Sequence, residues 1–261
     1  MSRSLDTYDH ISIAEIVIYA FFLVVGVYLC FKHGVRRTTG WVYLVIFAIA
    51  RILGSALRLA TTSNPSDVGL YVGWQVLNGV ALGPLILLLL GMLGRCYDSI
   101  NRQGHVVVKP LYQRIIRLMM LVAIILTIVG GTQSDMTMQG GHVHVAYTTL
   151  SKAGTALMIP VFVMVILVAI IALFNQGYIS QGEHRILFAV FASVPFVAVR
   201  LAYSCVLVLG GHQGSAWLFL GASVIMEMMA VLICEAVGVT LAKVPPAPKE
   251  DHQLREGHTR A

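Results

Sequence analysis

Charged residues are scarce in this sequence of 261 residues. Asp, Glu, Lys and Arg make up only 11% of it, whereas 57% of the residues are hydrophobic and the mean hydropathy is +0.81. Ordinary soluble domains carry about 25% charged residues. The composition therefore excludes an ordinary soluble domain and indicates a polytopic membrane protein.

Motifs for metal, redox and nucleotide chemistry are also missing. The four cysteines show no CxxC or other metal-ligand spacing, which favours apolar packing. The pair His142 and His144 lacks a clear third ligand and is a weak metal signal. Phosphate-binding GxxxxGK[ST] loops and Rossmann glycine patterns do not occur, and no internal repeat supports an inverted-repeat transporter. We predict no cofactor and no metal site.

Long apolar runs occupy most of the chain. Each is about 20 residues long, which is enough for a helix to cross a bilayer, and none alternates like a membrane β-strand. The predicted fold class is all-α: a seven-helix transmembrane bundle (residues 11–243) between an extramembrane N-terminus (1–10) and a disordered cytosolic tail (244–261). The predicted spans are Ile11–Phe31, Trp41–Ala60, Val68–Leu93, Ile115–Gly130, Ala146–Phe174, Ile186–Leu209 and Ser215–Ala242.

Basic residues outside the spans lie almost entirely on one side of the predicted bundle. The first, third and fifth connections and the tail hold thirteen Lys and Arg residues, whereas the opposite side holds Arg3 alone. Because cytoplasmic loops are enriched in Lys and Arg, we predict an outside or lumenal N-terminus and a cytosolic C-terminus, in the endoplasmic reticulum or plasma membrane. The net charge of +6 then reflects topology and contact with anionic lipids, and no nucleic-acid partner is predicted.

Polar and charged side chains interrupt six of the predicted spans. A charge near the bilayer centre costs at least about 2.5–3.5 kcal/mol, so such residues normally face partners, water or a ligand. Helical spacing places them in stripes; Arg51, Ser55 and Arg58, for example, stand at i, i+4 and i+7. The stripes overlap in depth, which predicts a polar cavity in the outer half of the bundle. The residues expected there are Glu15, Tyr19, Arg51, Arg58, Trp74, Gln75, Asn78, Lys152, Arg200, Tyr203, Ser223 and Glu227.

The charges predicted at this cavity do not balance. Four cations face only two deep anions, Glu15 and Glu227. Because an unpaired buried charge is very costly, the surplus predicts a small amphipathic ligand, anionic or oxygenated, as a partner besides membrane lipids. The alternative is a scaffold of ion pairs, with Arg51 bound to Glu227 and Arg58 to Glu15. The four cations are Arg51, Arg58, Lys152 and Arg200.

Seven different short motifs are spread along the chain up to Gly238. They are Ile11–Tyr19 (ISIAEIVIY), Gly40-Trp41, Phe47–Arg58 with its RILG core, Leu82–Leu85 (LGPL), Ile128–Gly131 (IVGG), Pro195–Tyr203 (PFVAVRLAY) and Glu235–Gly238. In this order they resemble a family of filamentous-fungal seven-helix membrane proteins of uncharacterised function. The resemblance implies the seven-helix fold and no particular activity. By weaker analogy, fungal integral-membrane terpene cyclases are also small seven-helix proteins that use buried carboxylic acids.

Three functions are compatible with these features. An enzyme would carry out an acid/base cyclisation or isomerisation of a terpenoid-like metabolite, with Glu227 as general acid or base and Arg51 and Tyr203 assisting. The remaining cavity residues would then bind the substrate. A seven-helix receptor or sensor would bind an amphipathic anionic ligand in the same cavity. A transporter is the third alternative. A retinal protein is disfavoured, because the last span contains no lysine.

Overall fold

The structure is a computed structural model that describes residues 4–33, 39–102, 110–139, 142–179, 182–211 and 214–241. Seven helical segments within these residues are long and apolar enough to cross a membrane, as predicted. They are Thr7–His33, Gly40–Ser63, Val68–Asn101, Leu111–Thr132, Thr149–Phe174, His184–Val208 and Ala216–Thr240. The first helix begins at Thr7, within the segment predicted to be extramembrane, and the predicted tail lies outside the described residues.

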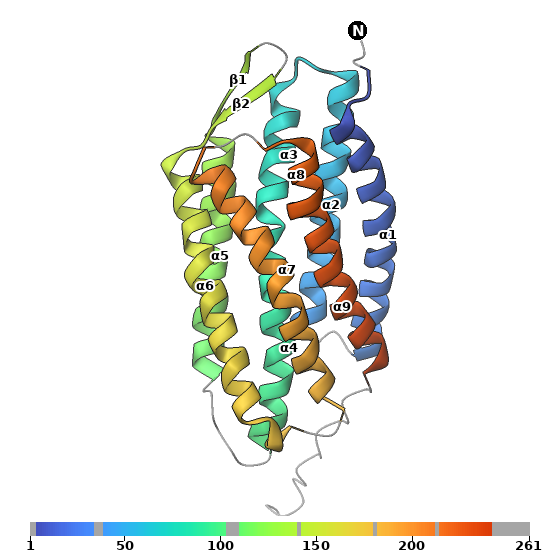
Figure 1. The fold of residues 1–261 in the computed structure, drawn as a ribbon, viewed down its shortest axis with the longest axis vertical. Helices are drawn as coiled ribbons and strands as arrows, with labels where there is room; N and C mark the ends of the chain where they lie inside the picture. The colour runs from blue at the N-terminus through green and yellow to red at the C-terminus, as the bar shows by residue number, and fades with distance from the viewer. Residues whose placement is uncertain are drawn as a thin grey trace, which may run out of the picture.

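Helices form nearly all of the described chain and run along the long axis of the molecule (Figure 1). A single hairpin of two strands interrupts them. The elements in chain order are α1 (Thr7–His33), α2 (Thr39–Ser63), α3 (Val68–Val80), α4 (Leu82–Arg102), α5 (Pro110–Thr132), β1 (Asp135–Gln139), β2 (His142–Ala146), α6 (Thr149–Phe174), the short η1 (Gln176–Tyr178), α7 (His184–Val208), α8 (Ala216–Phe219), the π-helical η2 (Leu220–Ile225) and α9 (Met226–Thr240).

The third membrane span is the central helix of the bundle and consists of α3 followed by α4. Its most apolar window is 83% buried, against 28–50% for the other six spans. The two helices meet at Ala81, where Pro84 explains the interruption. A proline has no N–H to donate to the carbonyl four residues earlier, here Val80, and its ring crowds that carbonyl. The break separates two helices with very different surroundings.

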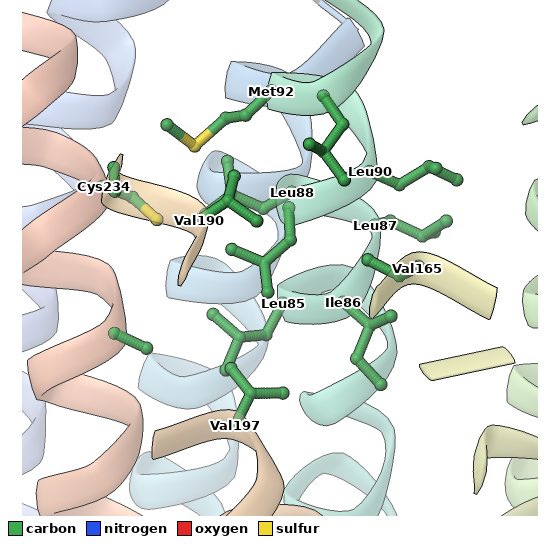
Figure 2. Close-up of a cluster of buried hydrophobic side chains, with 14 of the residues drawn as sticks. Leu85, Ile86, Leu87, Leu88, Leu90, Met92, Val165, Val190, Val197 and Cys234 are labelled. Atoms are coloured by element: carbon green, nitrogen blue, oxygen red, sulfur yellow. The ribbon is translucent and has the colours of Figure 1, made fainter. Parts of the chain in front are cut away.

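The α4 half of this span holds the apolar core. Every residue from Ala81 to Gly94 is buried, because α2, α6 and α7 pack around this helix. Figure 2 shows part of this core, in which Leu85, Leu88 and Val190 point toward one another between α4 and α7. Complete burial of so many leucines fixes α4 as the axis around which the other helices are arranged.

Helix α5 covers the outside of the bundle. Many of its side chains, such as Leu118 and Leu121, are exposed to the surroundings. Its inner side touches α6 very closely. A Cβ atom at Gly130 would lie 2.1 Å from the Ser151 backbone nitrogen, and one at Gly154 would lie 2.8 Å from the Thr127 nitrogen. Small residues thus allow the two backbones to approach.

The connection between α5 and α6 is an antiparallel hairpin in which Asp135 pairs with Ala146. It lies at the same end of the molecule as the N-terminus (Figure 1). We call this the hairpin end. The side chains of His142 and His144 lie outside the described part of the structure, so the weak metal signal at this pair stays untested.

Candidate functional site

The Arg51 side chain joins three helices in the middle of the bundle. Its Nη2 atom lies 2.6 Å from Glu227 Oε2 of α9 and 3.2 Å from Glu15 Oε1 of α1. Ser55, one turn further along α2, donates to Glu15 Oε2 at 2.6 Å. The Tyr19 hydroxyl lies 3.5 Å from Glu227 Oε2, and the guanidinium lies over the Tyr19 ring. The predicted stripes on the first two spans therefore face each other.

A second arginine, Arg200 of α7, binds the other side of the same acid. Its Nε donates to Glu227 Oε1, and its Nη1 donates to Ser204 Oγ one turn away. Its Nη2 donates to the backbone carbonyl of Asn78 at 2.8 Å. The Asn78 side chain in turn accepts a hydrogen bond from Arg51 Nη1. Asn78 thus bridges the two arginines from α3.

Four charged residues form this network, which we call the ion-pair quartet: Glu15, Arg51, Arg200 and Glu227. Each is at most 3% exposed. The scaffold pairing of Arg51 with Glu227 is confirmed. Two guanidinium groups and two carboxylates give a formal charge of zero, so the quartet balances its own charge. A buried group in which each charge lies beside an opposite one avoids much of the penalty of an unpaired ion, although Arg51 Nε has no hydrogen-bond partner among the described residues.

A largely apolar pocket with several polar groups lies next to the quartet, with Arg200 in its wall. The lining comes from α3, α5, α6 and α7 and mixes amide, hydroxyl and apolar groups. Most of it belongs to those ends of the helices that face the hairpin, so the pocket occupies the half of the bundle toward the hairpin end. The lining residues are Gln75, Val76, Asn78, Gly79, Thr127, Gly131, Tyr147, Ser151, Thr155, Met158, Arg200, Tyr203, Ser204, Leu207 and Val208.

The pocket is narrow. Its cavity volume is only about 40 Å³. Gln75 donates across the pocket wall to the hydroxyl of Tyr147, the residue before the α6 N-cap Thr148. Burial raises the pKa of Tyr147, so this hydroxyl keeps its proton and remains a donor. The space suits a small polar head group.

Arg58 belongs to a separate cluster. Its Nη2 lies 2.6 Å from Asp6 Oδ2, and its Nε lies 3.2 Å from Asp9 Oδ1. Its guanidinium also lies 4.9 Å from the centroid of the Trp74 ring and 5.1 Å from that of the Tyr8 ring, and the two rings pack edge to face. The predicted pairing of Arg58 with Glu15 is therefore wrong, since Glu15 binds Arg51 and Ser55 instead.

The sequence contains a signal for this cluster that composition alone does not reveal. Asp6 and Asp9 are spaced like a capping box, and each accepts a hydrogen bond from the backbone N–H of the other at 2.9–3.0 Å. This reciprocal pattern starts a helix at Thr7. It places two acidic side chains of the segment predicted to be extramembrane beside α2, where they form ion pairs with Arg58.

Lys152 does not reach the quartet or the pocket. It lies on the exposed side of α6, whereas its neighbour Ser151 and the nearby Thr155 are buried and line the pocket. With Lys152 outside and Arg58 paired elsewhere, the predicted surplus of buried cations around Glu15 and Glu227 does not exist. The expectation that excess positive charge attracts an anionic ligand therefore loses its basis.

The remaining predicted residues fall into three places. Gln75 and Tyr203 line the pocket, and Trp74 packs beside Arg58. Ser223 is fully buried on η2, one turn before Glu227, and its hydroxyl has no hydrogen-bond partner among the described residues. The pocket residues that spacing did not single out are Thr127, Tyr147, Ser151 and the apolar lining, which four separate helices bring together.

Seven membrane-length helices around a buried ion-pair network and a pocket of mixed lining define a multi-pass membrane protein in a lipid environment. The chain belongs to the family described as Domain of unknown function (DUF7702), whose model matches residues 5–244. Among curated proteins, none matches the chain. Membership in a family without an assigned activity agrees with the family resemblance in the motifs. The fungal origin and the cyclase analogy stay sequence-based predictions.

Proposed function

We propose that this protein is a seven-helix receptor or sensor that binds a small amphipathic molecule in the pocket beside Arg200. The observation that carries this proposal is the composition of the pocket wall. It combines a buried guanidinium, two phenols, two side-chain amides and several hydroxyls with apolar residues. Convergent polar groups in a largely apolar concave site are typical of small-molecule binding.

The connection between pocket and quartet favours a sensor. Arg200 contacts the pocket directly and binds Glu227 of α9, and Glu227 binds Arg51 of α2. A ligand that accepts hydrogen bonds from Arg200 changes the polar contacts that link α1, α2, α3, α7 and α9. Such a ligand therefore shifts the packing of the bundle whenever it binds one arrangement of these contacts better than another.

An enzyme with Glu227 as general acid or base has less support. Glu227 is fully buried, both of its oxygens lie in ion pairs, and it is absent from the pocket lining. Tyr203 does line the pocket and contacts Arg200 through its ring, so it remains the best candidate for chemistry at this site. No comparable feature favours a transporter.

The orientation follows from the basic residues. We place the hairpin end and the pocket on the outer or lumenal side, because the connections at the opposite end carry nearly all Lys and Arg residues of the loops. The membrane is the endoplasmic reticulum or the plasma membrane. An N-linked glycosylation tag inserted before Asp6 tests this proposal: glycosylation supports it, and modification of a C-terminal tag instead opposes it.

Binding is tested by native mass spectrometry of the full chain released from its own membranes. We expect a bound small molecule on the unmodified protein. Val208→Phe, which fills the pocket, abolishes this adduct. The matched control is Val206→Phe, whose side chain is 50% exposed on the outside of the same helix and which keeps the adduct. An adduct that survives Val208→Phe with equal intensity contradicts the proposed site.

A further inference from the structure

We infer that the pocket selects an uncharged, oxygen-bearing head group, such as a hydroxyl or carbonyl, over a carboxylate or an amine. This inference rests on the proposed function and specifies its ligand class. The juxtaposition behind it is Arg200, a pocket wall residue, with Glu227 bound to it from outside the pocket. Arg200 thus offers hydrogen-bond donors to the pocket, while Glu227 balances the positive charge of its guanidinium.

The charge balance of the quartet excludes a counter-ion role for the ligand. Glu15 and Glu227 supply one carboxylate for each of the two guanidiniums, and every member of the quartet lies within 3.2 Å of an opposite charge. An anionic head would lose its hydration in the pocket without meeting an unbalanced cation, and it would repel Glu227. A cationic head would meet the Arg200 guanidinium directly.

The donors available in the pocket fit an uncharged acceptor. A guanidinium has five N–H groups, of which three are used by Glu227, Ser204 and Asn78. Two therefore remain on a residue that lines the pocket. The Tyr147 hydroxyl accepts from Gln75 and keeps its own proton to donate. A hydroxyl or carbonyl oxygen accepts such bonds at a small desolvation cost compared with an ion.

The small volume of the pocket limits the size of the head group, and its apolar lining suits the carbon atoms next to that group. Only about 40 Å³ admits the centre of a water-sized group, so a single oxygen function fits better than a phosphate or a sugar. The apolar part of the lining, which includes Val76, Met158 and Leu207, contacts the carbon chain. These features together describe a simple lipophilic alcohol, ketone or ester.

The test measures protection of a cysteine in the pocket. Leu207→Cys, in a Cys205→Ala background, is alkylated with N-ethylmaleimide in proteoliposomes. Four probes with chains of the same length are compared at equal membrane concentration: decanol, methyl octyl ketone, decanoate and decyltrimethylammonium. The matched control is Val206→Cys, because Val206 is the exposed neighbour of Leu207. The comparison is made at about pH 8, well above the pKa of a carboxyl group in water.

We expect decanol and the ketone to protect Leu207→Cys at concentrations about tenfold lower than decanoate or the ammonium probe, and no probe to protect Val206→Cys selectively. Stronger protection by decanoate than by decanol overturns the inference while supporting a ligand pocket. Equal modification in the presence of all four probes defeats the proposed pocket itself. The two failures are therefore distinct.

A charge substitution gives a second, independent readout. Glu15→Gln removes one negative charge from the quartet and leaves Arg51 with Glu227 as its remaining acid. The surroundings of the pocket then carry one net positive charge, and we expect the preference for decanol over decanoate to shrink about tenfold or more. Glu15 does not itself line the pocket, so an unchanged preference contradicts a selection by charge balance.

Discussion

The two halves of the central span, α3 and α4, bury opposite kinds of side chain. Around α4 the neighbours are leucines and valines that contribute packing, as Figure 2 shows. Around α3 they are Arg51, Arg200 and the pocket, which Asn78 and Gln75 contact. Polar contacts between membrane helices average only about 0.6 kcal/mol. The apolar half therefore contributes mainly close packing, whereas the polar half depends on a balance of charges that is costly to disturb.

The largest expected effect tests whether the polar half tolerates an unbalanced charge. Glu227→Ala leaves Arg51 and Arg200 without their shared acid. We expect a loss of about 3–5 kcal/mol in the free energy of unfolding, measured by denaturation in mixed micelles. Met229→Ala, at an exposed position of the same helix, serves as control. Equal stability of the two variants would mean that the quartet is not a closed ion-pair network.

The next effect concerns the apolar half. Leu88→Ala removes a fully buried side chain of α4 and should cost about 2–4 kcal/mol, because the rigid surroundings collapse only partly into the cavity. Leu118→Ala on the outside of α5, where the side chain is 61% exposed, should change stability by less than about 0.5 kcal/mol. A reversed order in micelle denaturation would contradict the placement of the core around α4.

A smaller effect is expected where two helices touch below the hairpin. Gly130→Ala places a Cβ 2.1 Å from the Ser151 nitrogen and forces α5 away from α6. We expect a loss of about 1–3 kcal/mol. Ligand protection of the pocket should fall as well, since Thr127 and Ser151 line it from these two helices. Gly177→Ala, with no atom within 4 Å of the added Cβ, should leave both unchanged.

The smallest effect distinguishes a buried charge from an exposed one. Lys152→Gln should change the free energy of unfolding by less than about 0.5 kcal/mol, because Lys152 lies on the exposed side of α6. Arg200→Gln, in contrast, frees Glu227 from one of its two partners. Similar destabilisation by both variants, measured in the same micelles, would show that Lys152 does belong to the polar half.

Helical spacing was sufficient to predict much of the quartet. One face of α1 holds Ser12, Glu15 and Tyr19, and one face of α2 holds Arg51 and Ser55. The polar atoms of each face can be buried only if the other face supplies their partners. Spacing failed for Lys152 because α6 is the most apolar span, with a mean hydropathy of 3.2. A helix that is apolar on every side gives no indication of which side faces inward.

Two other features could not be predicted from the spans taken one at a time. The partners of Arg58 lie in a segment assigned to the outside of the membrane, and only the capping pattern of Asp6 and Asp9 reveals that the helix begins there. The pocket arises where four helices and Tyr147 meet. Its position depends on close contacts such as that at Gly130, which periodicity does not encode.

The pairing order of the quartet has a consequence for biogenesis. Glu15 and Arg51 lie on the first and second of the described membrane-spanning helices, and Arg200 and Glu227 lie on the last two. These two helical hairpins can therefore each leave the translocation machinery with their quartet charges already paired. The contact between Arg51 and Glu227, which joins the beginning of the chain to its end, forms only after synthesis of the final helix.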